Sequence, residues 1–203
     1  MGSPDFGTNF RIEASRENEL VTAALKLILE NEDKDENQPF ETIGTVRRHV
    51  KAYDIGNGTC ARLHFSMGMT TAERDFQNHL ALIKDGFPVP ELRSGIYSNG
   101  RQSAFAVSVI DGVDRVESRS PGTIKSDSKQ IIDIMRLAML KGWKPIDWAA
   151  SGNILREDST GRLVVVDVTD WIKISTLNQV EQISSLNYIK SIIEEHEAVV
   201  SVN

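Results

Sequence analysis

Apolar residues recur with the helical period in four segments of the chain, and each of these segments predicts an amphipathic helix. The segments are Glu19 to Leu29, Thr71 to Lys84, Ser128 to Leu140 and Leu177 to Glu197. In the second segment, the residues predicted to face the core are Ala72, Phe76, Leu80 and Ile83. This segment stops at Gly86 and Pro88, which end helices.

Between the helical segments the pattern changes to alternation or to short apolar runs, which predict strands. The segment from Phe40 to Phe65 alternates and contains Gly-Asn-Gly at positions 56 to 58, so a β-hairpin is expected there, with a further strand before it. Another strand is expected over Ala104 to Ile110, just before an Asp-Gly pair. Leu163 to Val166 is apolar at every position and is expected to be a strand buried on both faces, within a short hairpin.

The composition narrows the classes of protein that fit this pattern. With 203 residues, the chain is long enough for one globular domain built as two small lobes. The single cysteine, Cys60, excludes a disulfide framework and a cysteine-based zinc site. The net charge of −6 gives no general basic surface for nucleic acid, no apolar run is long enough to span a membrane, and no secretory signal is visible. Residues 1–10 are interpreted as a cloning remnant or a flexible start.

Three polar residues surround the predicted buried hairpin: Asp147, Asn153 and Asp167. Asp167 ends the apolar strand, where a carboxylate is costly unless a cation neutralises it. Magnesium prefers oxygen ligands in near-octahedral geometry, so a carboxamide on a turn and a carboxylate at a strand end suit it. Each of the three residues alone also fits an ordinary role in a turn, a cap or a strand end. Their order along the chain favours a metal site.

The sequence around these residues resembles a known family. The run GWKPIDWAASGNIL, which contains Asp147 and Asn153, and the later LVVVDV, which contains Asp167, resemble the catalytic and metal-binding loops of protein kinases. The resemblance extends from about Ile43 to Trp171. It implies that Asp147 orients the acceptor hydroxyl and that Asn153 and Asp167 hold Mg²⁺ for ATP.

The resemblance also implies a fold: α+β, bilobal and protein-kinase-like, with a small antiparallel-sheet N-lobe and a truncated, mostly helical C-lobe. Residues 11–110 would form an N-terminal helix and the N-lobe, and residues 111–203 a minimal C-lobe with both loops. The chain departs from the family in its motifs. Pro145 and Ile146 replace the His-Arg pair before the catalytic Asp, and the loop to Asn153 is one residue longer than usual. Asp-Val-Thr replaces Asp-Phe-Gly.

The phosphate-binding residues match the kinase pattern less well than the catalytic and metal-binding loops do. Only Gly44 stands where kinases carry a glycine-rich loop, and Arg48 lies where lysine-deficient members of the family place their phosphate-binding cation. In the strand TCARLHF, alternation places Cys60, Arg62 and His64 on one face, predicted to point toward the nucleotide. Arg62 is the leading replacement for the usual Lys, because arginine grips phosphate bidentately, and His64 is the second candidate. The alternative for Arg62 is a solvated face.

Two further parts of a kinase nucleotide site are expected from the resemblance. The helix from Thr71 to Lys84 would supply the acid that pairs with the cation, and Glu73 is preferred to Asp75 because it borders the apolar stripe; a surface position is the alternative. The strand that runs into Asp-Gly resembles the hinge between kinase lobes. Backbone groups of Ser108, Val109 and Ile110 are therefore expected to bind adenine.

Two classes of function follow from the resemblance. The first is an ATP- and Mg²⁺-dependent Ser/Thr protein kinase. The truncation resembles the minimal kinases that bacterial pathogens inject into host cells through type III secretion, which implies a soluble effector in the host cytoplasm acting on a host protein. One group of these kinases targets a heat-shock chaperone. A related enzymatic hypothesis is a small-molecule phosphotransferase of the aminoglycoside-kinase type, because DGFPVPEL resembles a segment of those kinases. The second class is a pseudokinase that acts as a binding module.

Overall fold

The structure is a computed structural model that describes residues 26, 50–56, 58–65, 69–98, 102–114, 121–148 and 153–202. The helices are α2 (Met69–Asp85), α3 (Pro121–Lys141) and α4 (Gln179–Ser201), with the 3-10 helix η2 (Ile174–Thr176). The strands are β1 (Val50–Asp54), β2 (Thr59–Phe65), β3 (Tyr97–Ser98), β4 (Gln102–Ser108), β5 (Gly112–Asp114), β6 (Trp143–Lys144), β7 (Ile154–Glu157), β8 (Leu163–Val165) and β9 (Ile172–Lys173). Apart from Lys26, the helix predicted over Glu19 to Leu29 lies outside the described residues, as does the strand predicted before Val50.

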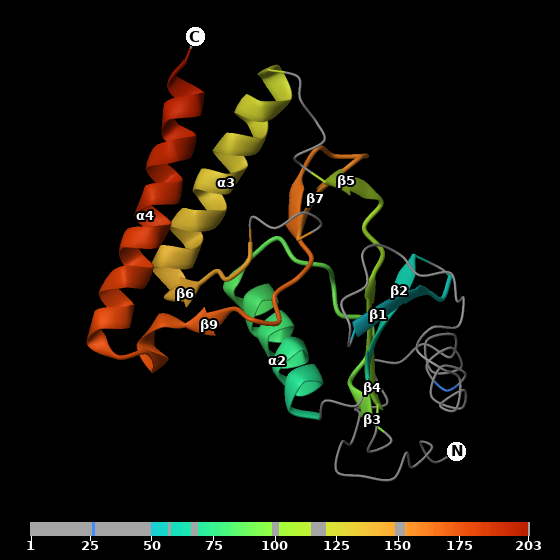
Figure 1. Ribbon diagram of the computed structural model, residues 1–203. Helices are drawn as coiled ribbons and strands as arrows, with labels where there is room; N and C mark the ends of the chain where they lie inside the picture. The colour runs from blue at the N-terminus through green and yellow to red at the C-terminus, as the bar shows by residue number, and fades with distance from the viewer. Residues whose placement is uncertain are drawn as a thin grey trace. The chain divides into compact units, whose positions relative to one another are not determined.

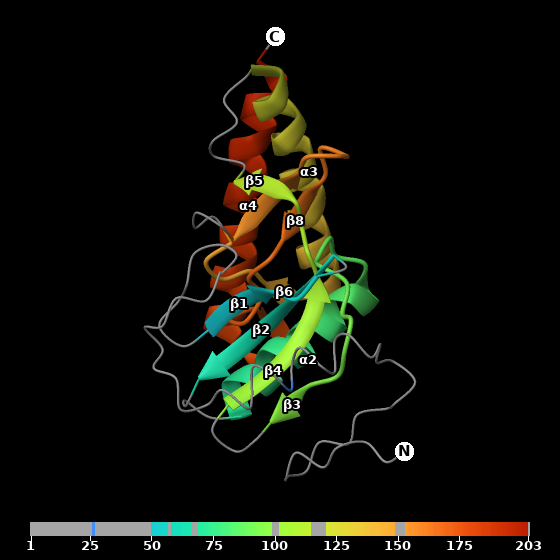
Figure 2. The same cartoon turned by 90° about the vertical axis from the view of Figure 1, so that its right-hand side faces the viewer.

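The chain divides into two compact units, each with its own core. The described part of the first unit contains a four-stranded antiparallel sheet in the order β1-β2-β4-β3, together with the first part of α2, up to Leu80. The hairpin predicted around positions 56 to 58 is confirmed, with Asp54 opposite Cys60. Figure 2 shows this sheet with α2 behind it. The core between them is Cys60, Ala72, Ile96, Phe105 and Val107, with Phe76 packed against it.

The face of α2 that is buried differs from the predicted one. Leu80 and Ile83 are 36% and 37% exposed, so the predicted stripe is wrong at these two positions. Asp75 and His79 are fully buried instead. Two ionisable side chains occupy buried positions because each finds a partner inside the protein: an ion pair for Asp75 and a backbone carbonyl for His79.

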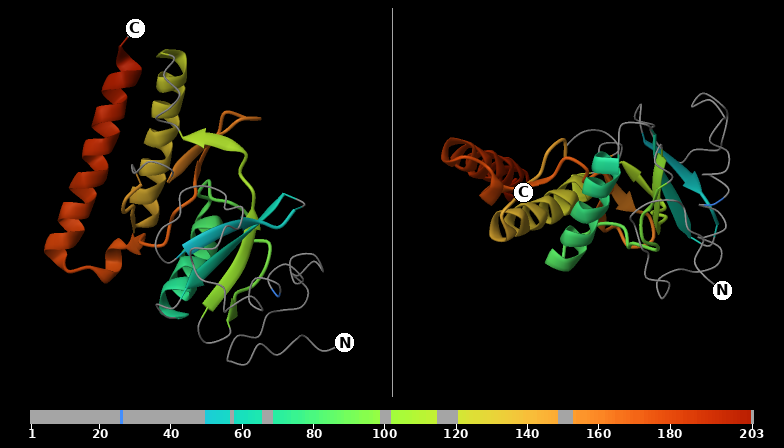
Figure 3. Two further views of the ribbon diagram at one scale, coloured as in Figure 1. Left: turned by 45° about the vertical axis from the view of Figure 1, so that its right-hand side comes forward. Right: turned by 90° about the horizontal axis from the view of Figure 1, so that it is seen from below.

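The second unit contains the end of α2, from Ala81, and residues 110–203, and its largest elements are α3 and α4. These two helices run side by side and antiparallel (Figures 1 and 3). α3 begins at Pro121, earlier than the predicted Ser128, whereas α4 begins close to its predicted start. A capping box between Asn178 and Glu181 fixes the first turn of α4. No helix in the described part of the chain is long and apolar enough to cross a bilayer.

The predicted hairpin in the second unit is confirmed as β7 and β8, which pair antiparallel. All three residues of β8 are buried, as the apolar run predicts. Gln130 of α3 holds the hairpin: its side chain donates to the Gly161 carbonyl (3.0 Å) and accepts from the Leu163 amide (2.8 Å). β5 completes this sheet on the other edge of β7. Gly112 permits that pairing, because a Cβ at this position would overlap the carbonyl oxygen of Arg156.

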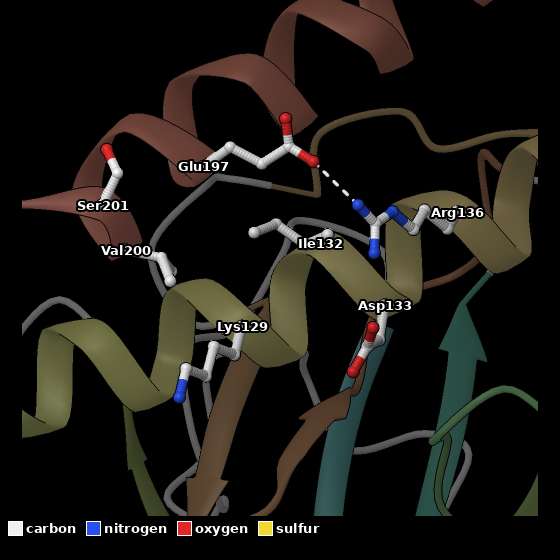
Figure 4. A pocket seen from close by; sticks show the side chains of 7 residues that line it. All are labelled: Lys129, Ile132, Asp133, Arg136, Glu197, Val200 and Ser201. Carbon is white, nitrogen blue, oxygen red and sulfur yellow. Dashed lines mark hydrogen bonds and ion pairs between the residues drawn. The ribbon is translucent and has the colours of Figure 1, made fainter.

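A pocket of about 420 Å³ lies on the surface where α3 and α4 meet. It is lined by Lys129, Ile132, Asp133, Arg136, Glu197, Val200 and Ser201. Figure 4 shows the ion pair that joins the two helices there, from Arg136 Nη2 to Glu197 Oε1 at 2.7 Å. Both side chains are about half exposed, so the pair contributes little to stability.

Candidate functional site

Asp147 follows β6 and has an unusual backbone conformation. Its φ is +52°, the only positive φ at a non-glycine residue in the described ranges. The left-handed region is unfavourable for a residue with a Cβ, although aspartate tolerates it better than most. Such a conformation persists where the surroundings impose it, and the side chain of Asp147 is exposed. The turn therefore presents a carboxylate at the surface of the second unit.

Asn153 connects this turn to the buried hairpin. Its side chain is buried, and its Nδ2 donates to the carbonyl oxygen of Asp147 at 2.7 Å. Its own carbonyl accepts from the amide of Val166 at 2.9 Å. Because a carbonyl oxygen can only accept, the amide nitrogen must face Asp147, and Oδ1 is left as an oxygen ligand. One residue thus ties the Asp147 turn to the end of β8.

Asp167 lies directly after that point, two residues beyond β8. Its side chain is partly buried, between the buried strand and the buried residues Val168 and Thr169. Its Oδ1 accepts a long hydrogen bond from the Thr169 amide, at 3.4 Å. The carboxylate therefore lies at the end of an apolar strand, where the sequence predicts it.

The structure brings the three predicted residues into one neighbourhood of the second unit. Asn153 bonds Asp147 through its side chain, and through its backbone it bonds the residue before Asp167. An amide oxygen and a carboxylate are ligands of the kind that Mg²⁺ takes, and a second carboxylate close by can accept a hydrogen bond from a hydroxyl. Among the described residues no group of three or more His, Cys, Asp or Glu is placed to hold a metal ion. Asn153 and Asp167 stay the predicted metal ligands.

Arg62 pairs with an acid on α2, but not with the predicted one. Arg62 Nη2 lies 3.1 Å from Asp75 Oδ2, and the two side chains are 12% and 0% exposed. Glu73 is exposed, so the preference for Glu73 as the partner is wrong. The reason is the rotation of α2, which turns Asp75 rather than Glu73 toward the sheet. The alternative of a solvated face for Arg62 does not hold either.

The face of β2 that carries Arg62 packs against α2. Cys60 from the same face is part of the core with Phe105, and the Arg62 guanidinium lies 5.8 Å from the centre of the Phe105 ring. The ion pair and the ring together fix the guanidinium in place. Arg48 lies outside the described residues, and of His64 only the backbone pairing, opposite Val50 and Ser103, is described.

No protein-family model matches the sequence, and no curated protein is similar to it. Solved structures do match. One is the Rio2 kinase of Chaetomium thermophilum, in a crystal structure of its ADP/Mg²⁺-phosphoaspartate complex, with a TM-score of 0.51 and 18% sequence identity. The match covers 91% of this chain and 62% of that one. The chain has a kinase-like fold. At this identity the likeness concerns the fold alone, and the chain spans less than two thirds of that kinase.

Within this kinase-like fold, the segment predicted to bind adenine uses part of its backbone internally. The Ser108 amide donates to the Glu91 carbonyl at 2.8 Å, and the Val109 amide donates to the Gly58 carbonyl at 2.8 Å. The predicted strand also ends at Ser108 rather than at Ile110. Two backbone amides of this segment are therefore bonded within the protein, and adenine binding by backbone groups of Ser108, Val109 and Ile110 stays a prediction.

His79 is a buried residue beside the ion pair that the sequence pattern did not single out. Its Nε2 lies 2.5 Å from the Pro90 carbonyl oxygen, which can only accept, so Nε2 carries the proton. Its Nδ1 is buried without a hydrogen-bond partner among the described residues. Burial lowers the pKa of His79 below its ordinary value of 6.5, and the charge of Arg62 adds to the shift, while the Pro90 bond and Asp75 oppose it. The imidazole is therefore neutral in the folded protein at pH 7.

This neutral histidine predicts a pH-dependent stability. Below about pH 6.5 the unfolded chain binds a proton at His79 that the folded chain resists, so the free energy of unfolding falls as the pH drops toward the folded pKa. The expected slope is at most about 1.4 kcal/mol per pH unit. His79→Gln, which keeps an N–H donor near the Nε2 position, should remove it. Urea unfolding of both proteins between pH 5 and 7 measures the difference, and parallel curves would contradict the assignment.

A second titrating group acts in a separate range. Hydrogen bonds from Trp143 and Lys173 lower the pKa of Asp85 below its ordinary 3.8, so the stability that Asp85 contributes is lost only in stronger acid. The range from pH 5 to 7 is therefore free of this effect.

Proposed function

We propose that the chain is an ATP- and Mg²⁺-dependent phosphotransferase of the protein-kinase type, and that its two units correspond to the two lobes of a kinase. One observation carries the proposal: Asn153 bonds both the Asp147 turn and the backbone next to Asp167. Kinases need a carboxylate for the acceptor hydroxyl and an amide oxygen and a second carboxylate for the metal. The kinase-like fold, and the ADP and Mg²⁺ bound by the Rio2 kinase, support this reading.

Each residue has a distinct role in the proposal. Asp147 accepts the hydrogen bond of the acceptor hydroxyl and orients it, and Asn153 Oδ1 and Asp167 hold Mg²⁺. The metal, when bound, neutralises charge on the phosphates. Arg62 and Asp75 take the place of the Lys-Glu pair of kinases; Arg62 lies on a strand and Asp75 on the helix that follows it, as in that family. The predicted nucleotide-binding residues also include Arg48, His64 and the backbone groups of Ser108, Val109 and Ile110.

The preferred acceptor is a Ser or Thr hydroxyl of a protein, and the minimal-kinase resemblance makes a host protein reached after secretion the proposed target. Two alternative functions remain to be distinguished from protein phosphorylation. A pseudokinase would bind nucleotide or a partner without transfer, and a small-molecule phosphotransferase would act on a free hydroxyl. The Rio2 structure adds a third product to look for, a phosphorylated aspartate. Hydroxylamine cleaves an acyl phosphate and leaves a phosphoserine intact, so it separates these products.

The proposal predicts that Asp147→Ala separates binding from transfer. The variant should bind Mg²⁺-ATP with nearly parental affinity, because the metal ligands remain, and should transfer phosphate about 10²- to 10⁴-fold more slowly, the usual contribution of a positioned general base. Calorimetric titration with Mg²⁺-ATP and transfer of labelled γ-phosphate measure the two quantities. Equal loss of affinity and rate would show that Asp147 belongs to the nucleotide site and not to the acceptor site.

A further inference from the structure

The residue after Asp147 is anchored far along the chain. Trp148 is 3% exposed, and its indole Nε1 donates to the Tyr188 hydroxyl at 3.1 Å. Its ring makes a T-shaped contact with the His196 ring, with centroids 6.2 Å apart and planes at 68°. His196 Nδ1 in turn lies 3.1 Å from the Ser128 hydroxyl. Through these contacts Trp148 is fixed to both α3 and α4, the helices that Figure 3 shows side by side.

Asp147 therefore lies between two fixed points. Its carbonyl oxygen accepts from Asn153, and the next side chain is anchored by Tyr188 on α4. A left-handed φ at a non-glycine residue is held by its surroundings rather than by its own preference, and φ and ψ set where the carboxylate points. Loosening the Trp148 anchor frees the turn to relax toward a more favourable conformation.

We propose that Tyr188 is a positioning residue, which acts through Trp148 to hold the Asp147 carboxylate in its productive direction. The inference rests on the proposed function, in which that carboxylate orients the acceptor hydroxyl. Tyr188 is 43% exposed, so water can reach the indole N–H when the hydroxyl is removed. The cost in stability is therefore small, while the direction of Asp147 becomes less defined. Misplacement of a catalytic group by about 1 Å lowers a rate by up to about 10²-fold.

The first test is Tyr188→Phe, measured by steady-state transfer of labelled γ-phosphate. We expect kcat to fall about 5- to 20-fold, on the scale of that misplacement effect. The KM for ATP should stay within about twofold, because ATP contacts neither residue in the proposal. Trp148→Phe removes the donor from the same bond and should give the same loss, and the double variant should be no slower than either single one. The matched control is Ser191→Ala, which removes another exposed hydroxyl of α4, bonded to the Tyr188 carbonyl, and should leave kcat unchanged.

The second test asks whether the effect passes through Asp147. In an Asp147→Ala background, Tyr188→Phe should leave the residual rate unchanged, because the group that it positions is gone. If Tyr188→Phe lowered the rate by the same factor in both backgrounds, the proposal would be overturned and Tyr188 would be a structural residue. A parental kcat in Tyr188→Phe would also overturn the proposal. The indole ¹⁵N–¹H resonance of Trp148, assigned with Trp148→Phe, checks the anchor without activity. If the parent transfers no phosphate, the proposed function fails, and an unshifted resonance in Tyr188→Phe separately overturns the anchor.

Discussion

Asp167→Ala is expected to abolish Mg²⁺-dependent nucleotide binding and phosphate transfer together. The carboxylate is the only charged group of the proposed Asn-Asp ligand pair, so its loss leaves the metal with one neutral side-chain oxygen. Since a catalytic metal supplies several kcal/mol of charge stabilisation, the rate should fall by about 10³-fold or more. The Asp167 side chain is only partly buried and its bond from the Thr169 amide is long, at 3.4 Å, so the variant should remain folded.

The measurement is a pair of titrations, Mg²⁺-ATP and ATP with EDTA, followed by transfer of labelled γ-phosphate. Asp158→Ala is the matched control, because it removes an exposed carboxylate from the β7–β8 turn of the same unit. It should behave like the parent. An Asp167→Ala protein with parental turnover would show that the metal loop has been assigned to the wrong aspartate.

Asp75→Ala is expected to destabilise the protein by about 3–5 kcal/mol, because it leaves the guanidinium of Arg62 without its ion-pair partner in a largely buried place. Arg62→Met should also be strongly destabilising, since it leaves a buried carboxylate. The double variant Arg62→Met/Asp75→Ala removes both charges and should lose less stability than the two single variants added together. Urea unfolding measures all four proteins, and the coupling free energy is the sum of the single losses minus the double loss.

Glu73→Ala provides the control for this cycle. Glu73 lies two residues before Asp75 on the same helix, yet its side chain is exposed, so its removal should change the free energy of unfolding by no more than about 0.5 kcal/mol. If Asp75→Ala were as mild as Glu73→Ala, the buried ion pair would contribute nothing to stability. In that case the proposed replacement of the kinase Lys-Glu pair would lose its structural support.

The local sequence pattern was sufficient to predict those elements in which the apolar residues are the buried ones. The apolar run Leu163 to Val166 predicted a strand buried on both faces; all three residues of β8 are buried, while Val166 lies just beyond the strand and is partly buried. The Gly-Asn-Gly turn predicted a hairpin, and β1 pairs with β2 around it. In both cases the residues that decide the structure are close in sequence, so no distant contact was needed to predict them.

The buried face of α2 was predicted wrongly because contacts with residues distant in sequence decide which side chains are buried there. Asp75 and His79 lie three and seven residues after Ala72, so the helical period places them on the same face as Ala72. The predicted buried face did not include them, because it was assigned from apolar residues alone. Their burial depends on Arg62 and on the Pro90 carbonyl, which tertiary structure brings to them. The signal available in the sequence was Arg62 on the same strand face as Cys60. If that face packs against the following helix, the helix has to supply an acid on the side that faces the sheet.

The candidate site shows the same division. The residue types of Asp147, Asn153 and Asp167 and their order were predicted from the sequence, together with the kinase resemblance. The left-handed φ of Asp147 and its anchoring through Trp148 and Tyr188 were not, because forty residues separate that donor from its acceptor. Likewise, the bonds made by the Ser108 and Val109 amides depend on Glu91 and Gly58, which leave no sign in the strand itself.

Transfer of the γ-phosphate of ATP in the presence of Mg²⁺ is the activity proposed for this chain, and a labelling assay detects it. Purified protein is incubated with γ-labelled ATP, with Mg²⁺ or with EDTA, and labelled protein and labelled inorganic phosphate are counted together, so that transfer to any protein in the reaction or to water is detected. We expect labelled product in the Mg²⁺ reaction, none above background with EDTA and none with Asp167→Ala. A parent protein that releases no label and gains no thermal stability from Mg²⁺-ATP would contradict the claim.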